Sequence, residues 1–350
     1  MRRVDILPDG DIILAVKGSL ELRVSSVVLS MVSPVFKTML GPHFAEGQAL
    51  RRQSAGLPHV ITLPDDDAQL MKVLCLVSHH QARGVQAPSD EASKAMFVIE
   101  LVALADKYDC MEILKYPAAS CMTAVDPELL NRTTRMMCAE AAFKLDDALF
   151  FGRCTRSLVL EGEFLAWGAS TCRDSILNAV RETADRTLSI LAGTIDDIVT
   201  SAGDRLGALY EHHSVDNCFV SKECEYNTAA VGTVLRALRA VQLRPPSSQS
   251  CKLRDKIRSV QALEVPTVTL ISPCETCFDG DSENILEMFE RTISHARNTV
   301  QRIFTAVCSD CLKQISEKNS TCRTPHHGEW ATSDEDGDGR LHYYPKLGDW

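Results

Sequence analysis

The chain has 350 residues, 45% of them hydrophobic, which is enough for two or three domains with substantial cores. Its formal net charge of −10 at pH 7 argues against nucleic-acid binding, which needs a basic surface to neutralise phosphates. No apolar run approaches the ~20 residues of a membrane span, and the first residues lack the apolar segment of a secretory signal. We therefore expect an intracellular protein of the nucleus or cytoplasm with no membrane partner.

Two short strands are expected near the start of the chain. The apolar runs Ile12–Val16 and Leu20–Val24 flank a turn at Lys17-Gly18-Ser19. Aliphatic residues on both sides of a Gly-Ser turn favour a hairpin, and the alternation in the second run gives that strand one buried face.

Two short helices are expected next. The first begins after Ser25-Ser26, whose hydroxyls suit an N-cap. The second begins at Pro34, with Ser33 as its cap, because proline is tolerated at the first position of a helix but not inside one. Their apolar positions are Val27, Val28, Met31 and Val32 in the first helix and Val35, Phe36, Met39 and Leu40 in the second.

A third strand and a longer helix complete the N-terminal pattern. A polar stretch over 45–58 leads to the short apolar run 60–63, which Pro64 stops. Asp65, Asp66 and Asp67 then supply caps and negative charge at the start of a helix that runs to about Val77. The predicted order is strand, strand, helix, helix, strand, helix.

This order and its short motifs resemble the BTB/POZ domain, in particular the divergent form common in filamentous fungi. The resemblance covers about the first third of the chain and depends on the order of the motifs rather than on any one of them. The matching segments are Asp9-Gly10-Asp11-Ile12-Ile13-Leu14, Val27-Val28-Leu29-Ser30, Ser33-Pro34-Val35-Phe36-Lys37-Thr38-Met39-Leu40, Phe44-Ala45-Glu46-Gly47, Ile61-Thr62-Leu63-Pro64-Asp65-Asp66-Asp67 and Leu104-Ala105-Asp106-Lys107-Tyr108-Asp109-Cys110.

The resemblance implies a non-enzymatic adaptor or scaffold that binds other proteins. BTB domains pair with themselves or with other BTB domains, and some recruit partners to cullin-type ubiquitin ligases. The candidate surface for self-association is the helix face with Val27, Val28 and Met31, and the alternative for these residues is packing within the domain. Because residues 1–8 are few, we expect the chain to lack the strand that some BTB dimers exchange.

The predicted fold class is α+β, with a BTB/POZ fold around a small three-stranded sheet followed by a mostly α-helical region. The Pro- and Ser-rich segment 244–250 marks the best break between helical blocks. The expected divisions are 1–115 for the BTB/POZ domain with its trailing helix, 116–244 for a helical region, 245–325 for a second helical block, and 326–350 for a disordered acidic tail.

Fourteen cysteines in a reducing compartment are expected to be core, metal-bound or reactive residues rather than disulfides. Six of them stand alone beside apolar residues and are interpreted as small buried hydrophobes. These are Cys75, Cys110, Cys121, Cys138, Cys154 and Cys172.

Two CxxC pairs, Cys274/Cys277 and Cys308/Cys311, are the weak candidates for a zinc site. Four thiolates on two such pairs can complete a tetrahedral zinc site. The sequence between them argues against one shared ion, because its apolar residues repeat at heptad spacing and predict one helix of about 25 residues, roughly 37 Å long. The repeating positions are Phe289, Ile293, Ala296, Val300, Ile303 and Val307.

Three interpretations of these cysteines stay open. The helix breaks near 294–298 and brings the pairs together, or each pair has other partners, or Cys308 and Cys311 are neighbours on a buried helix face that continues through Leu312 and Ile315. The other partners would be Cys322 and His326 for the second pair, and Cys218 and Cys224 with His212 or His213 for the first.

Two other functions are alternatives to the protein-interaction role. One is a regulatory module stabilised by zinc, and the other is a dithiol oxidoreductase using Cys274 and Cys277, whose surroundings lack the strand-then-helix context of reactive CxxC motifs. We find no GxSxG, GxxxxGK, HExxH or GxGxxG motif, so we expect no enzymatic activity. Asp334–Leu341 resembles the start of an EF-hand loop, but position twelve is Pro345 instead of glutamate.

Overall fold

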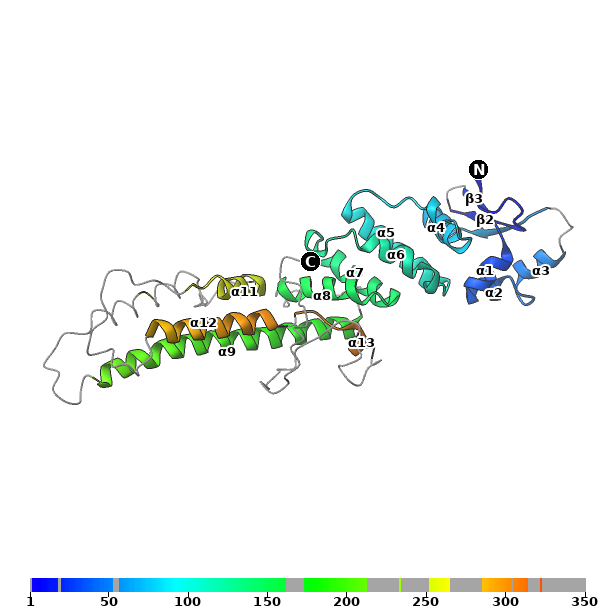
Figure 1. Ribbon diagram of the computed structural model, residues 1–350. Coiled ribbons are helices and arrows are strands. Elements are labelled where there is room, and N and C mark those ends of the chain that lie inside the picture. The colour runs from blue at the N-terminus through cyan, green and yellow to red at the C-terminus, as the bar shows by residue number, and fades with distance from the viewer. Residues whose placement is uncertain are drawn as a thin grey trace, which may run out of the picture. The chain divides into compact units, whose positions relative to one another are not determined.

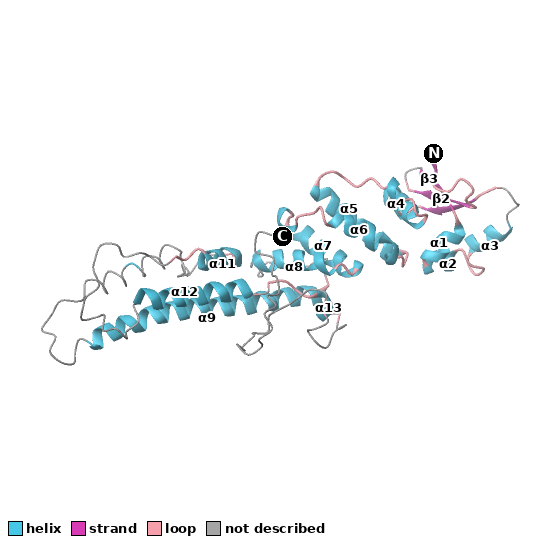
Figure 2. Cartoon of the chain, in the orientation of Figure 1, coloured by secondary structure: helices cyan, strands magenta, loops and turns pink. Residues whose placement is uncertain are grey.

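The structure of the chain is a computed structural model, which describes residues 2–17, 20–52, 57–161, 173–212, 233, 252–264, 285–303, 305–313 and 322 (Figures 1 and 2). A small four-stranded sheet lies at the N-terminus, and helices dominate the rest, so the expected α+β class is confirmed at this level. None of the described helices is both long and apolar enough to cross a membrane. The chain forms two compact units. The first contains Met1–Ser157, Ala169–Leu177 and Val307–Thr324, and the second contains Leu158–Gly168, Asn178–Ala306 and Pro325–Trp350.

The sheet consists of β1 (Arg2–Asp5), β2 (Ile12–Val16), β3 (Leu20–Val24) and β4 (His59–Leu63), in the order β1-β3-β2-β4. Strands β2 and β3 pair antiparallel, as the hairpin pattern predicts, while β1 pairs parallel with β3 and β4 pairs parallel with β2. Central strand β2 is the most enclosed, and its Ile12 and Leu14 are fully buried. The buried residues of β2, β3 and β4 form part of the N-terminal core.

The fourth strand corrects the predicted three-stranded sheet. The sequence Arg-Arg-Val-Asp of β1 has no apolar alternation, so nothing in its pattern marks it as a strand. Strand β1 is held in the sheet by backbone pairing with β3 and by an ion pair between the two strands, in which Arg3 Nη2 lies 2.8 Å from Glu21 Oε2. An edge strand of this kind is defined by its neighbour rather than by its own residues.

Helices α1 (Ser26–Val32), α2 (Pro34–Met39), α3 (Ala45–Arg52) and α4 (Ala68–Ser78) follow. The predicted cap of α2 is confirmed, because Ser33 Oγ accepts a hydrogen bond from the Phe36 backbone N–H at 3.0 Å and Pro34 is the first helical residue. The cap of α4 is confirmed as well, with Asp67 accepting from two backbone N–H groups.

Helix α3 occupies the first part of the segment 45–58, for which the sequence suggested only a polar stretch. It packs against α2 and β4 and comes very close to the turn after α2. A Cβ atom at Gly47 would lie 1.9 Å from the Gly41 carbonyl oxygen, a distance that no side chain could occupy. The position therefore requires glycine for close approach of two backbones.

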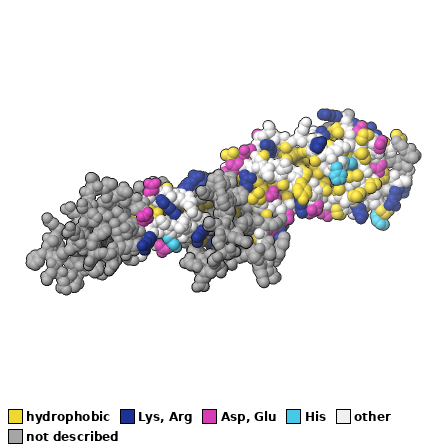
Figure 3. All heavy atoms as spheres, in the orientation of Figure 1, with side chains coloured by type: hydrophobic (Ala, Val, Ile, Leu, Met, Phe, Trp, Pro, Cys, Tyr) yellow, Lys and Arg dark blue, Asp and Glu magenta, His cyan; other side chains and the backbone are white. Residues whose placement is uncertain are grey.

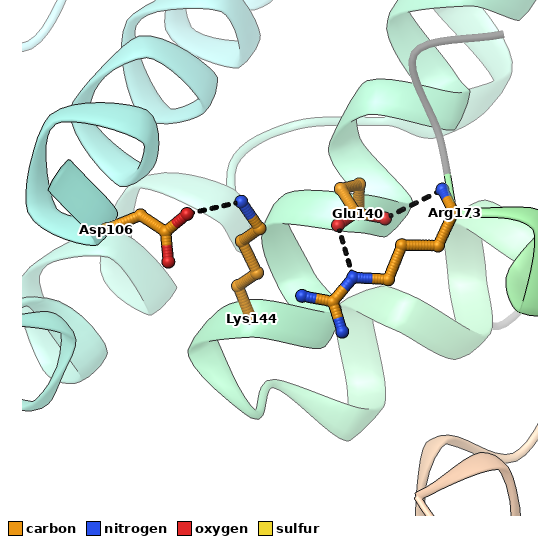
Figure 4. A network of polar contacts seen from close by, with 4 residues as sticks. All are labelled: Asp106, Glu140, Lys144 and Arg173. Carbon is orange, nitrogen blue, oxygen red and sulfur yellow. Dashed lines mark hydrogen bonds and ion pairs between the residues drawn. The ribbon is translucent and has the colours of Figure 1, made fainter. Parts of the chain in front are cut away.

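The rest of the first unit is helical, and α7 is its central link. Lys144 Nζ on α7 pairs with Asp106 of α5 at 2.8 Å, and Glu140 on α7 accepts from Arg173 Nε at 2.9 Å (Figure 4). Helix α5 also packs on both α4 and α7, so α7 is joined to the N-terminal part through α5. The elements are η1 (Ala82–Gly84), α5 (Glu91–Lys107), η2 (Met111–Leu114), α6 (Lys115–Met122), η3 (Pro127–Leu129), α7 (Arg132–Leu145) and α8 (Ala148–Glu161).

The second unit consists of long amphipathic helices. Its described helices are most of α9 (Asp174–His212), α11 (Leu253–Gln261) and α12 (Ile285–Arg302), and α11 packs on α12. Buried residues recur on α9 at alternating intervals of four and three, which is a heptad stripe. They are Val180, Ala184, Thr187, Leu191, Thr194 and Ile198.

Helix α12 corrects the predicted 25-residue helix. It runs without a break through 294–298 and carries the expected buried positions Phe289, Ile293, Ala296 and Val300, but it ends at Arg302. Beyond it, the Val307 backbone N–H donates to Thr155 Oγ1 on α8 at 3.0 Å. This tertiary hydrogen bond takes the place of helical hydrogen bonding, and the short helix α13 (Ser309–Leu312) begins soon afterwards.

Candidate functional site

The N-terminus of α1 is fixed by polar contacts from two other segments. The Asp11 carboxylate accepts from the Ser26 backbone N–H at 2.7 Å and from the Ser26 hydroxyl. The His79 ring accepts from the Ser25 backbone N–H at 3.0 Å through Nε2, and its Nδ1 donates to the Cys75 carbonyl at 2.8 Å. These contacts place α1 against the end of α4.

The hydrogen bonds also define the protonation of His79. A backbone N–H can only donate, so Nε2 must be unprotonated and the ring neutral, with its proton on Nδ1. Desolvation lowers the pKa of His79 from 6.5, and the neighbouring His80 lowers it further, while the bond to Cys75 acts in the opposite direction. The anchor of α1 is therefore complete when His79 is neutral.

Helix α1 turns two of the three predicted interface residues toward solvent. Val27 is 64% exposed and Met31 is 80% exposed, whereas Val28 is only partly exposed and Leu29 is fully buried. The buried side of α1 is thus formed by Ser26 and Leu29 rather than by the predicted apolar positions. Val27 and Met31 are four residues apart, so they share one face of the helix.

The exposed face of α1 carries no charged side chain of its own. Figure 3 shows hydrophobic side chains intermixed with charged ones over the first unit. Residues 26–32 contain no charged side chain, while Val27 and Met31 supply two large apolar side chains within one helical turn. The first unit also has large apolar side chains exposed elsewhere: Val35, Phe44, Leu57, Val60, Tyr116, Leu129 and Leu149.

Asp66 joins the N-terminal fold to the end of α5, a role that the sequence did not reveal. Its carboxylate, 4% exposed, accepts from the Tyr108 hydroxyl and from Lys107 Nζ, each at 2.7 Å. The Tyr108 ring stacks on Phe36 with centroids 4.4 Å apart, and the Ser33 hydroxyl donates to the Tyr108 carbonyl. Burial and the bond to Asp66 raise the pKa of Tyr108, so its hydroxyl stays a donor.

A signal for this role was present in the sequence but ambiguous. Three consecutive aspartates precede α4, and only one of them is needed as its cap. Asp67 takes that position, which leaves Asp66 to accept hydrogen bonds from a segment more than 40 residues away. Local rules cannot choose between adjacent aspartates, because the choice depends on where α5 ends.

Four of the six solitary cysteines are core residues, as predicted. Cys75, Cys110, Cys138 and Cys154 are buried, Cys121 is partly exposed, and Cys172 lies outside the described residues. Burial raises the pKa of Cys75 and of Cys110 to about 12. Thiols in this state are protonated at neutral pH and have little nucleophilic character.

Three other cysteines form a cluster in the first unit. The Sγ atoms of Cys308, Cys311 and Cys322 all lie within 4.8 Å of one another, and those of Cys311 and Cys322 are 3.6 Å apart. Cys308 is buried, Cys322 is partly exposed and Cys311 is exposed. This geometry could hold a metal ion, and it matches one of the cysteine groupings that the sequence left open.

The remaining candidates for metal binding or dithiol chemistry cannot be placed. Cys274, Cys277, Cys218, Cys224, His213 and His326 lie outside the described residues, and of His212 only the backbone is described. The acidic segment 334–341 also lies outside them.

No model of a known protein family matches the chain, and no curated protein sequence matches it either. The α1 surface and the cysteine cluster are therefore judged by their own geometry. The first can bury apolar area against another protein, and the second can hold a soft metal ion or form a disulfide.

Proposed function

We propose that this chain is a non-enzymatic protein-interaction protein whose N-terminal unit pairs with a second copy of itself through the exposed face of α1. The observation that carries the proposal is the exposure of Val27 (64%) and Met31 (80%) on a helix without charged residues. Neither side chain stabilises the monomer by being buried, while the opposite side of the helix is fixed to the core.

The charge of the chain favours an uncharged contact between two copies. Each copy carries a formal net charge of −10, so two copies repel each other on average. A symmetric contact places the same surface on both sides, and a surface without charges avoids like-charge pairs at its centre. The α1 face meets this condition.

The expected affinity can be bounded from the apolar side chains. Fully burying a valine or methionine side chain stabilises by roughly 1.5–3 kcal/mol, so four such side chains in a symmetric pair give on the order of 6–12 kcal/mol. Association itself costs about 4–15 kcal/mol. The face of α1 is therefore the centre of the proposed interface, and neighbouring surface has to contribute the rest.

The resemblance of the first third of the chain to BTB/POZ domains supports the same proposal, because such domains pair with themselves or with one another. Two capping serines, the Pro34 start of α2 and the contact between Asp66 and Tyr108 give the resembling segments a common framework. Recruitment of partners to a cullin-type ubiquitin ligase is the other role that the resemblance implies, and co-purification with a cullin would test it.

The test is a dilution series of the full-length chain by analytical ultracentrifugation, with Met31→Asp as the variant. We expect the wild-type chain to be dimeric. In the variant, the dissociation constant of the dimer should be at least 100-fold higher, since each copy would place a carboxylate at the contact. Leu129→Asp is the matched control, because Leu129 is 72% exposed and belongs to η3 rather than to α1.

Two results would contradict the proposal. One is a wild-type chain that stays monomeric over the whole series, and the other is a Met31→Asp variant that dimerises as tightly as the control. Circular dichroism of each variant shows whether the fold is retained, which we expect because both side chains are exposed in the monomer.

A further inference from the structure

We propose that Cys308, Cys311 and Cys322 together bind one zinc ion. A tetrahedral zinc ion with Zn–S bonds of ~2.3 Å holds its sulfurs about 3.8 Å apart. The Sγ atoms of Cys311 and Cys322 are already 3.6 Å apart, and all three lie within 4.8 Å of one another. Small side-chain rotations would therefore be enough to place the three sulfurs around one ion.

The chain holds the first two ligands in a defined loop. Cys308 directly precedes helix α13, and Cys311 follows three residues later on the same turn. On one side of the pair, the Val307 backbone N–H donates to Thr155 Oγ1 at 3.0 Å. On the other side, Lys313 Nζ donates to Asp146 Oδ1 at 2.6 Å. The pair is fixed to α8 and to the end of α7 by these two contacts.

The loop that carries the first two cysteines is largely buried, with Cys311 as its exposed member. Cys308, Ser309 and Asp310 are at most 7% exposed, and the Ser309 hydroxyl has no hydrogen-bond partner among the described residues. Lys313, the neighbouring cation, is paired with Asp146 and lies 4.8 Å from the centre of the Phe143 ring. A metal ion would balance the charge of the thiolates where Lys313 is already engaged.

The thiols of Cys308 and Cys311 are expected to be protonated until a metal binds. Burial raises the pKa of Cys308, although the backbone N–H groups of Cys311 and Asp310 act in the opposite direction. Desolvation and the contact with Cys322 raise the pKa of Cys311 to about 12. Zinc binding would then release protons, as it does at thiolate sites generally.

Zinc is the ion that this set of atoms fits best. Three thiolates are soft ligands, which favour zinc over magnesium or calcium. Structural zinc sites are almost always tetrahedral, and three sulfurs can occupy three corners of a tetrahedron. The three sulfurs leave one coordination position for water or a further side chain. Such an ion would join Cys322 to α13, a four-residue helix that is too short to be stable alone.

The test measures metal in the full-length chain after purification under reducing conditions and dialysis against Zn²⁺. Native mass spectrometry and elemental analysis report the zinc content, and Co²⁺ loading reports thiolate ligands through its sulfur-to-cobalt absorption. We expect one ion per chain in the wild type, and loss of that ion with a weakened cobalt spectrum in Cys311→Ser. Cys311 is exposed, so this substitution should leave the fold intact.

Two controls separate this site from other cysteines. Cys121→Ser removes a partly exposed cysteine outside the cluster and should keep the ion. The double variant Cys274→Ser/Cys277→Ser should also keep it. The proposal is overturned if the wild type takes up no zinc, if Cys311→Ser keeps a full cobalt spectrum, or if reduced protein that is exposed to air forms a disulfide between Cys311 and Cys322 in the presence of Zn²⁺.

Discussion

The two units of this chain bury their apolar residues in different ways. In the first unit, a small sheet and short helices meet through contacts between distant residues, such as Ser25 with His79 and Asp66 with Tyr108. In the second unit, α9 and α12 carry long stripes of buried residues at heptad spacing. A periodic pattern identifies the buried side of a long helix, but a helix of seven residues is too short for its pattern to decide which side faces the core.

Helix α1 and helix α12 illustrate this difference. The four expected positions Phe289, Ile293, Ala296 and Val300 of α12 are all buried. On α1, the sequence left interface or core packing open for Val27 and Met31, and the structure has both exposed with Leu29 buried between them. Three constraints from outside α1 set its orientation, namely Asp11, His79 and the turn into α2.

The sharpest way to test the comparison is a glycine-to-alanine change in each unit. Gly47→Ala would place a Cβ 1.9 Å from the Gly41 carbonyl oxygen, so we expect the free energy of unfolding to fall by about 3 kcal/mol. Gly193→Ala is the matched change on α9, where a Cβ meets nothing within 4 Å. It should raise helix stability by about 0.5–1 kcal/mol.

Urea unfolding, followed by circular dichroism, would measure both changes. Opposite signs are expected, because close approach of distant backbones governs the first position and helix propensity governs the second. Equal effects of the two substitutions would show that the units do not differ in this way.

A change at Asp66 tests whether the first unit depends on single long-range contacts. Asp66→Asn removes the charge that accepts from Lys107 and Tyr108, and we expect a loss of about 1.5–3 kcal/mol in unfolding free energy. Tyr108→Phe removes one donor, keeps the ring stacked on Phe36 and should cost about 1–2 kcal/mol. Chemical denaturation measures both values, and a neutral Asp66→Asn would contradict the structural role of this carboxylate.

The smallest expected effect is a pH dependence from His79. Its pKa is lowered in the folded chain, so the unfolded chain binds more protons just below pH 6.5. The stabilising contribution is complete above 6.5 and is lost as the pH falls through the folded pKa. The groups that act on the ring are the His80 side chain and the Cys75 backbone carbonyl. The Asp11 carboxylate accepts from Ser26, the residue after the one whose backbone N–H donates to the ring.

Comparing the wild type with His79→Gln would isolate this contribution. Glutamine has no titratable group, so the difference between the two denaturation midpoints should change between pH 7.5 and pH 5.5. A difference that is constant across this range would mean that His79 does not titrate differently in the folded and unfolded chains.

The sequence by itself determined the features that depend on neighbouring residues. The hairpin of β2 and β3, the Ser33 cap with Pro34, the Asp67 cap and the buried stripe of α12 all follow from patterns within a few residues or turns. It also pointed to Cys322 as one partner of Cys308 and Cys311, because their spacing is short. Local propensity and periodicity act over such distances, so these features could be predicted.

Only the tertiary structure decided the features that join distant segments. Strand β1 forms because its backbone pairs with β3. Helix α12 ends at Arg302, and shortly beyond it the Val307 backbone N–H donates to Thr155 Oγ1, 152 residues earlier in the chain. The exposed face of α1 depends in the same way on Asp11 and His79. The physical reason is that each of these outcomes depends on a hydrogen-bonding partner or a packing surface that the local sequence does not contain.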